Sequence, residues 1–155
     1  MKLQRLKSQS GFTIIELFVI LTVVIILLAI VVATYSGISK RERDIERKND
    51  IELLRSVFDT YYAKYNSYPS LQQANDANFR KTSFKDFDNQ KLRDPSNKSK
   101  SYELVAKPQP NSYAYSVTTN DAKDCDNKTA ATMCTRFTLT ATYERGGTFV
   151  KSGLN

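Results

Sequence analysis

A run of apolar residues from Phe12 to Ala33 contains only three polar side chains, those of Thr13, Glu16 and Thr22. As a helix with a rise of about 1.5 Å per residue, this run is about 33 Å long, which is enough to cross a bilayer. A carboxylate inside such a segment is unfavourable, because an Asp at the helix centre costs ~2.5–3.5 kcal/mol on insertion scales. Glu16 lies near the start of the run, where the cost is lower, but an ionised group that persists there is expected to have a partner.

The ten residues before Gly11 carry three basic side chains and no acidic one, so this end is expected to stay in the cytoplasm. A short basic leader, Gly11, Phe12 and then Glu16 four residues later resemble the class III signal of type IV pilins and pseudopilins. The basic residues of the leader are Lys2, Arg5 and Lys7.

The resemblance implies a role for each residue of this motif. A prepilin peptidase would cut between Gly11 and Phe12, and the new N-terminal Phe12 would be N-methylated. The carboxylate of Glu16 would pair with the N-terminal amine of a neighbouring subunit during assembly. An α-amino group has an ordinary pKa of about 7.7–8.0, so this amine would be largely cationic at neutral pH.

Other interpretations of the same segment are a secretory signal peptide and a plain single-pass anchor. The run is longer than the ~7–15 apolar residues of a signal peptide, and it ends without a clear A-x-A cleavage site. A plain anchor leaves the spacing from Gly11 to Glu16 unexplained. On that interpretation, Glu16 would simply extend toward the lipid headgroups.

Length and charge limit the part of the chain beyond the apolar run. Removal of eleven leader residues leaves 144, which is room for one small domain beyond the membrane-spanning part, and lowers the net charge from +7 to +4. The chain has no His, which excludes His-based acid–base and metal sites. No catalytic constellation is visible, so we expect a non-enzymatic protein without a cofactor or a metal.

Cys125 and Cys134 lie close together in the C-terminal third. In an exported domain, an even and local pair of cysteines indicates one disulfide, and two thiolates without His would make a poor zinc site. Three neighbouring acidic residues raise the question of calcium, but their spacing does not match an EF-hand loop. They are Asp121, Asp124 and Asp126.

The same helix is expected to continue beyond the apolar run to about Asn66. It should end there because Tyr68 precedes Pro69, and the residue before a proline is disfavoured in a helix. Apolar residues recur there at spacings of three and four, which is typical of an amphipathic helix packed on a domain. This stripe consists of Ile51, Leu54, Phe58, Tyr61 and Tyr65. Gly37 is the only obvious weak point of the helix.

The first part of this second half carries charges of both signs and predicts a solvated helix with ion pairs along it. The charged residues are Glu42, Glu46 and Asp50 alternating with Arg43, Arg47 and Lys48. Lys40, Arg41 and Arg43 lie just beyond the membrane, where headgroups or acidic side chains of neighbouring subunits are the expected contacts.

A polar connecting region with one or two short helices is expected next, docked by scattered apolar residues: Phe79, Phe84, Phe87 and Leu92. The sequence from Asp94 to Asn97 indicates a turn. A run of basic residues beside aromatics resembles a DNA-contacting patch, but interleaved acids favour a solvated loop. The basic residues are Lys81, Lys85, Lys91, Arg93, Lys98 and Lys100.

Alternating patterns after the connecting region predict strands at 102–106, 112–118, 136–143 and 148–151, with Gly146 and Gly147 forming a hairpin turn before the last one. The predicted fold class is α+β: a long N-terminal helix packed on a small antiparallel sheet, as in pilins. The expected segments are a leader (1–11), a membrane-spanning half-helix (12–35), an amphipathic half-helix (36–66), a connecting region (67–101) and a sheet with a disulfide loop (102–155).

The resemblance implies a structural subunit of a type IV pilus, which would serve adhesion, motility or DNA uptake. The alternatives are a pseudopilin of a type II secretion or competence system and a minor pilin. The implied partners are other copies in a helical filament, a prepilin peptidase, the assembly platform with its ATPase, the cytoplasmic membrane before assembly, and DNA or a host surface. The subunit would move from that membrane to an extracellular pilus.

Overall fold

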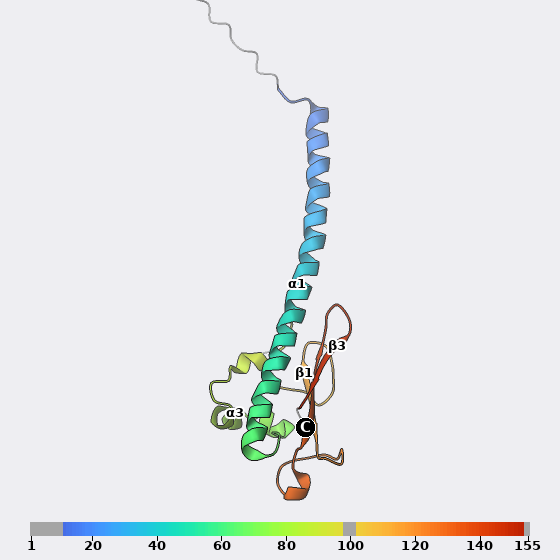
Figure 1. The fold of residues 1–155 in the computed structure, drawn as a ribbon. Helices are drawn as coiled ribbons and strands as arrows, with labels where there is room; N and C mark the ends of the chain where they lie inside the picture. The colour runs from blue at the N-terminus through green and yellow to red at the C-terminus, as the bar shows by residue number, and fades with distance from the viewer. Residues whose placement is uncertain (1–10, 98–101, 154–155) are drawn as a thin grey trace, which may run out of the picture. The chain divides into compact units, whose positions relative to one another are not determined.

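The computed structural model describes residues 11–97 and 102–153. It contains two compact units, Met1–Ser39 and Lys40–Asn155, and helix α1 (Ile14–Tyr65) contributes to both (Figure 1). The long N-terminal helix predicted from the sequence is therefore confirmed. It is continuous through Gly37, where an added Cβ would meet no atom within 4 Å.

Local side chains and backbone set the two ends of α1. The hydroxyl of Thr13 accepts a hydrogen bond from the Glu16 N–H at 3.2 Å, so Thr13 caps the helix and the first turn begins after it. At the other end, Asn66 has a φ of 53°, and its N–H donates to the carbonyl of Tyr62 at 2.7 Å. A left-handed Asn is a common helix terminator, and the predicted end at about Asn66 is confirmed.

Short helices in the connecting region follow from side chains that cap them. Ser70 caps α2 (Leu71–Asn75), Asp76 caps α3 (Ala77–Ser83), and Asp88 caps the 3-10 helix η1 (Asn89–Leu92). Each cap side chain accepts a backbone N–H of the first turn, which replaces a hydrogen bond that the helix end lacks. The predicted short helices are thus present.

Aromatic rings join this region to α1. The ring of Phe84 lies 5.7 Å from that of Phe58, and the ring of Phe79 lies 5.6 Å from that of Tyr61. Phe84 and Leu92 are buried, whereas Phe79 and Phe87 are partly buried. The apolar residues of the connecting region therefore dock it as predicted.

Three antiparallel strands form the sheet in the order β1-β2-β3: β1 (Tyr113–Thr118), β2 (Arg136–Thr142) and β3 (Thr148–Ser152). A second 3-10 helix, η2 (Ala130–Thr132), precedes β2. The turn between β2 and β3 places Gly146 and Gly147 at φ values of 92° and 88°, which only glycine adopts readily. The predicted hairpin is confirmed, and the sheet and α3 lie on opposite sides of the second half of α1 (Figure 1).

The predicted strand at 102–106 is wrong. In this segment, Val105 forms a single parallel bridge to Ala114, while the two backbone groups of Leu104 bind a side chain. The amide of Asn75 donates to the Leu104 carbonyl at 2.9 Å and accepts from the Leu104 N–H at 2.8 Å. These groups are therefore not available for a strand ladder.

The hydrophobic core lies between α1, the connecting region and one face of the sheet. Phe58 is fully buried, with its ring 4.7 Å from Tyr115 and 5.7 Å from Phe137. The predicted apolar stripe is confirmed for Ile51, Leu54 and Phe58, and Tyr61 is partly buried. The prediction is wrong for Tyr65, the last residue of the stripe, which lies at the helix end and is 45% exposed.

Candidate functional site

The N-terminal motif lies at the start of α1 and is exposed. Phe12 is 77% exposed, and Gly11 precedes it with no left-handed φ. A Cβ added at Gly11 would meet no atom within 4 Å, so the fold of this chain does not itself require glycine there. The leader before Gly11 lies outside the described residues.

Hydroxyl groups within the apolar half of α1 have partners inside the helix. The hydroxyl of Thr22 donates to the carbonyl of Phe18 at 2.8 Å, and that of Thr34 donates to the carbonyl of Ile30 at 2.9 Å. Such bonds allow polar residues to enter an apolar medium without unsatisfied groups. Since this half is also long and apolar enough to span a membrane, it is a candidate transmembrane segment.

Glu16 differs from these hydroxyl residues. Its backbone N–H is capped by Thr13, but its carboxylate has no hydrogen bond or ion pair within residues 11–97 and 102–153. Thr13-x-x-Glu16 also matches the spacing of a capping box, and an acid in the first turn favours the helix dipole. These local effects do not neutralise the charge. Cleavage after Gly11, methylation of Phe12 and pairing of Glu16 stay predictions.

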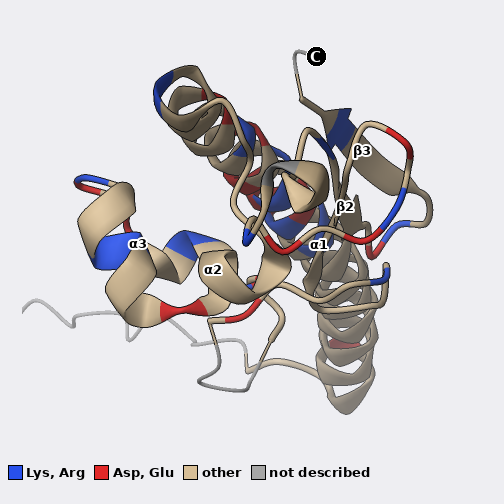
Figure 2. Cartoon of the chain, turned by 90° about the horizontal axis from the view of Figure 1, so that it is seen from below, with Lys and Arg blue, Asp and Glu red and all other residues tan. Residues whose placement is uncertain are grey.

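A network of charged side chains lies in the second unit, where the sequence predicted a solvated helix. That prediction is wrong for Arg47 and Asp50, which are 0% and 2% exposed, and the neighbouring Asp44 is also buried, at 8%. Acidic and basic residues are interspersed along the second half of α1 and the loops around it (Figure 2). The face of α1 that carries these three residues is covered by the connecting region and by the β2–β3 turn.

Arg47 is the centre of this network. Its Nε and Nη2 donate to the two carboxylate oxygens of Asp94 at 2.7 and 2.8 Å, a bidentate pair. Its Nη1 donates to Asp44 at 2.7 Å, and its Nη2 also reaches Glu144 at 3.0 Å and the hydroxyl of Ser96 at 2.9 Å. One guanidinium therefore joins α1, the turn after η1 and the β2–β3 hairpin.

Arg43 completes the network and corrects a second prediction. It was expected to contact headgroups or neighbouring subunits, but its guanidinium binds Glu144 of the same chain at 2.6 and 2.7 Å. The hydrogen bond from Arg43 holds the pKa of Glu144 well below its usual range, with further bonds from Ser96 and Arg47. Burial alone would lower the pKa of Arg47, but its carboxylate partners Asp94 and Glu144 raise it above the ordinary value.

Asp50 belongs to a smaller cluster beside this network. The hydroxyl of Tyr113 donates to its carboxylate at 2.8 Å, and Lys91 lies 3.2 Å from its other oxygen and 3.8 Å from Glu46. Burial raises the pKa of Asp50 above its usual value in spite of these partners. The cluster ties β1 and η1 to α1.

The sequence contained a signal for the buried charges. Asp44 and Arg47 precede Ile51 at spacings of three and four, so they continue the apolar stripe on the same face of the helix. Periodicity that includes polar residues would have placed them on the buried side. Nothing in the sequence pairs Arg47 with Asp94 or Glu144, because these partners come from distant segments.

The predicted disulfide between Cys125 and Cys134 is present, with the two Cα atoms 5.2 Å apart. The loop that it closes is anchored by Asn127, which sequence reasoning did not identify. The side chain of Asn127 donates to the Tyr68 carbonyl at 2.7 Å and accepts from the Cys134 N–H at 2.7 Å. The N–H of Tyr68 in turn donates to the Cys134 carbonyl at 2.7 Å, so the loop is held against the segment that follows α1.

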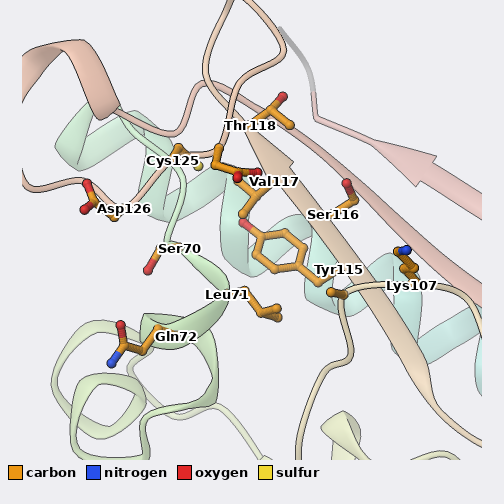
Figure 3. Close-up of a pocket in the computed structure, with 12 residues that line it drawn as sticks. Ser70, Leu71, Gln72, Lys107, Tyr115, Ser116, Val117, Thr118, Cys125 and Asp126 are labelled. Carbon is orange, nitrogen blue, oxygen red and sulfur yellow. The ribbon is translucent and has the colours of Figure 1, made fainter.

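A groove of about 370 Å³ lies beside this loop, between the edge of β1 and the start of α2 (Figure 3). The hydroxyl of Tyr115 donates to the Pro69 carbonyl at 2.8 Å and closes its floor. Asp124 and Asp126 line one end and are exposed. Within the described residues, no group of three or more Cys, Asp and Glu side chains gathers as metal ligands would.

The basic residues of the connecting region do not form one continuous free patch. Lys91 pairs with Asp50, and the guanidinium of Arg93 lies 5.8 Å from the ring centre of Tyr102. Lys81 and Lys85 are exposed. Lys98 and Lys100, which complete the run in the sequence, lie outside the described residues.

Comparison with known proteins identifies one curated relative. Type II secretion system core protein G of Aeromonas hydrophila is 32% identical to the chain over 71 residues, which are 46% of this chain and 50% of that protein. The predicted resemblance to pilins and pseudopilins is confirmed. The chain spans about half the length of this relative. No protein-family model and no solved structure matches this chain.

Proposed function

We propose that this chain is a pilin-like subunit that is cut between Gly11 and Phe12 by a prepilin peptidase and assembles through α1 into a helical filament. The observation that carries the proposal is the carboxylate of Glu16, which lacks a partner in the described chain at the start of an apolar helix. A charge in that position needs a partner from another molecule.

The amine of a processed Phe12 has the chemistry of that partner. When apolar helices stack with an axial stagger, the amine of an incoming subunit meets Glu16 of a subunit already in place. Removing one member of a buried ion pair costs ~3–5 kcal/mol, because the other charge is left uncompensated. The pair would therefore select one register among the many that an apolar surface permits.

Two assignments within this role are supported by different observations. The loop closed by Cys125 and Cys134 favours a type IV pilus, because it resembles the disulfide loop of pilins. The similarity to type II secretion system core protein G favours a secretion pseudopilus, and a competence pseudopilus or a minor pilin shares the same features. We propose the type IV pilus first, with the secretion pseudopilus as the second candidate.

In either assignment, the proposed role is structural and has no catalytic step of its own. The subunit waits in the cytoplasmic membrane and enters the filament through an assembly platform and its ATPase. The second unit then forms the filament surface and meets DNA, a host surface or a secreted protein.

Intact mass and N-terminal sequencing of protein from sheared surface filaments and from membranes test the proposal. A chain that starts at Phe12 with one added methyl group is expected in both fractions. One dominant band in sheared filaments supports a major pilus subunit, whereas a processed chain confined to membranes supports a pseudopilin or a minor pilin. A chain that starts at Met1 in both fractions contradicts the proposal.

The substitution Glu16→Gln tests the role of the carboxylate. The variant is expected to reach the membrane in normal amount and to yield at least tenfold fewer filaments by electron microscopy. Loss of the ion pair costs ~3–5 kcal/mol, and about 1.4 kcal/mol is enough for a tenfold change in an equilibrium constant. Glu42→Gln removes an exposed charge from the same helix and serves as the matched control. Equal filament yields from both variants would contradict assembly through Glu16.

A further inference from the structure

A second groove, of about 360 Å³, lies on the second unit between α1 and the β2–β3 turn. Arg41, Ile45 and Lys48 line it from one face of α1, since they are spaced by four and three residues. Arg145 lines it from the turn, together with Tyr143. Arg41, Lys48 and Arg145 are all exposed.

The acidic groups at this groove are already neutralised. Asp44 lines it, but the Asp44 carboxylate accepts from Arg47 at 2.7 Å and from the Glu144 N–H at 3.0 Å. The carboxylate of Glu144 is held by Arg43 and Arg47. The two guanidiniums therefore offset most of the negative charge of Asp44, Asp94 and Glu144 next to the groove.

The cations of the groove lack such partners. Arg41 and Arg145 make no ion pair within the described parts of the chain, and Lys48 lies over the ring of Phe149 at 5.8 Å. Three positive charges thus surround a groove that also offers the ring of Tyr143 and the half-exposed side chain of Ile45. This combination suits an anion that carries an apolar body.

The place of these cations along the chain indicates the source of the anion. From Ile14 to Arg41, α1 is about 40 Å long at 1.5 Å per residue, and a bilayer with its headgroups is about 40–45 Å thick. When the apolar half of α1 spans a membrane, Arg41 reaches the level of the headgroups. Tyr is enriched at that level, and Arg side chains near the end of a membrane-spanning helix extend to it.

We propose that this groove binds the phosphate of an anionic phospholipid headgroup, with Arg41, Lys48 and Arg145 as its donors. The inference rests on the membrane-spanning role of α1 in the proposed function, but not on filament assembly. Binding would hold the second unit at the membrane surface before assembly.

Native mass spectrometry of the full-length protein in neutral detergent, titrated with phosphatidylglycerol or with phosphatidylcholine of the same chains, tests the inference. The wild type is expected to bind phosphatidylglycerol at least tenfold more tightly. Each positive charge near an anionic surface raises the binding affinity about fivefold. The triple variant with Arg41→Gln, Lys48→Gln and Arg145→Gln should therefore lose the preference for phosphatidylglycerol. Arg145→Gln alone should reduce it about fivefold.

The matched control replaces three exposed lysines elsewhere on the second unit, Lys81→Gln, Lys85→Gln and Lys123→Gln, and should keep the preference. An equal loss in this control, or no preference in the wild type, would overturn the lipid site. If millimolar inorganic phosphate displaced the bound phosphatidylglycerol, the groove would be a site for a soluble anion instead. If the wild type showed no lipid preference but formed dimers that the triple variant did not form, the partner of the groove would be an acidic face of a second copy. Loss of lipid binding with normal filament yield leaves the proposed function intact.

Discussion

Among single residues, Arg47 joins three separate segments of the second unit. It is fully buried, and its partners Asp94 and Glu144 lie 47 and 97 residues away along the chain. A buried ion pair adds little to stability compared with an apolar pair of the same shape, but it penalises the loss of one member. Arg47 therefore specifies the position of its partners more than it strengthens the fold.

Arg47→Met is expected to lower the free energy of unfolding by about 3–5 kcal/mol, because Asp94 would be left buried and unpaired. Urea unfolding of the full-length protein in detergent, followed by near-ultraviolet circular dichroism of its tyrosines, measures the change. Arg41→Met, at an exposed position earlier in the same helix, should change it by less than about 0.5 kcal/mol. Similar values for the two variants would show that the network does not hold the fold.

Among the structural elements, the disulfide loop is joined to the end of α1 through Asn127 and Tyr68. The bond closes a short loop, with a sequence separation of 9 between its cysteines, and Cys134 is fully buried. Loop closure restricts the unfolded chain, and the backbone hydrogen bonds of the loop depend on its closed shape. The loop is thus a crosslink that is also held against the segment that follows α1.

Reduction of this disulfide is expected to lower the free energy of unfolding by about 2–3 kcal/mol. The measurement is the melting temperature of the protein with and without a thiol reductant, at equal protein concentration. The double variant Cys125→Ser and Cys134→Ser should melt at the lower temperature and respond to the reductant by less than the experimental error. A wild-type melting temperature that the reductant leaves unchanged would disprove a structural role for the bond.

Across the whole second unit, one ionic network joins the helix, the connecting region and the sheet. Its pH dependence follows from Glu144, whose folded pKa is depressed by Arg43. A depressed carboxylate contributes stability above its unfolded pKa and loses it as the pH falls through the folded value. Asp50, whose pKa is raised, acts in the opposite direction.

The wild type is therefore expected to lose stability as the pH falls below about 4.5, the ordinary pKa for Glu144. Glu144→Gln should be less stable than the wild type at pH 7, and its melting temperature should fall less steeply as the pH is lowered from there. Melting temperatures between about pH 7 and pH 3 measure both. Glu42→Gln, which removes an exposed acid of α1, controls for the general effect of acid, and parallel profiles for both variants would contradict the assignment.

Features that depend on local periodicity and spacing could be predicted from the order of the residues alone. The apolar run, the stripe of Ile51, Leu54 and Phe58, the alternation in β2 and the glycine turn all follow from side-chain pattern and backbone sterics. The nearby cysteines were also sufficient to predict their bond.

The folded arrangement was needed to show what the buried polar groups bind. The spacing of Arg47 from Ile51 places it on the buried face, but its pairing with Asp94 depends on two distant segments meeting in space. The segment 102–106 has a strand pattern, but the side chain of Asn75 takes the backbone groups of Leu104. Charge pairing and hydrogen-bond competition between distant segments arise only when the chain has folded, and no local pattern reports them.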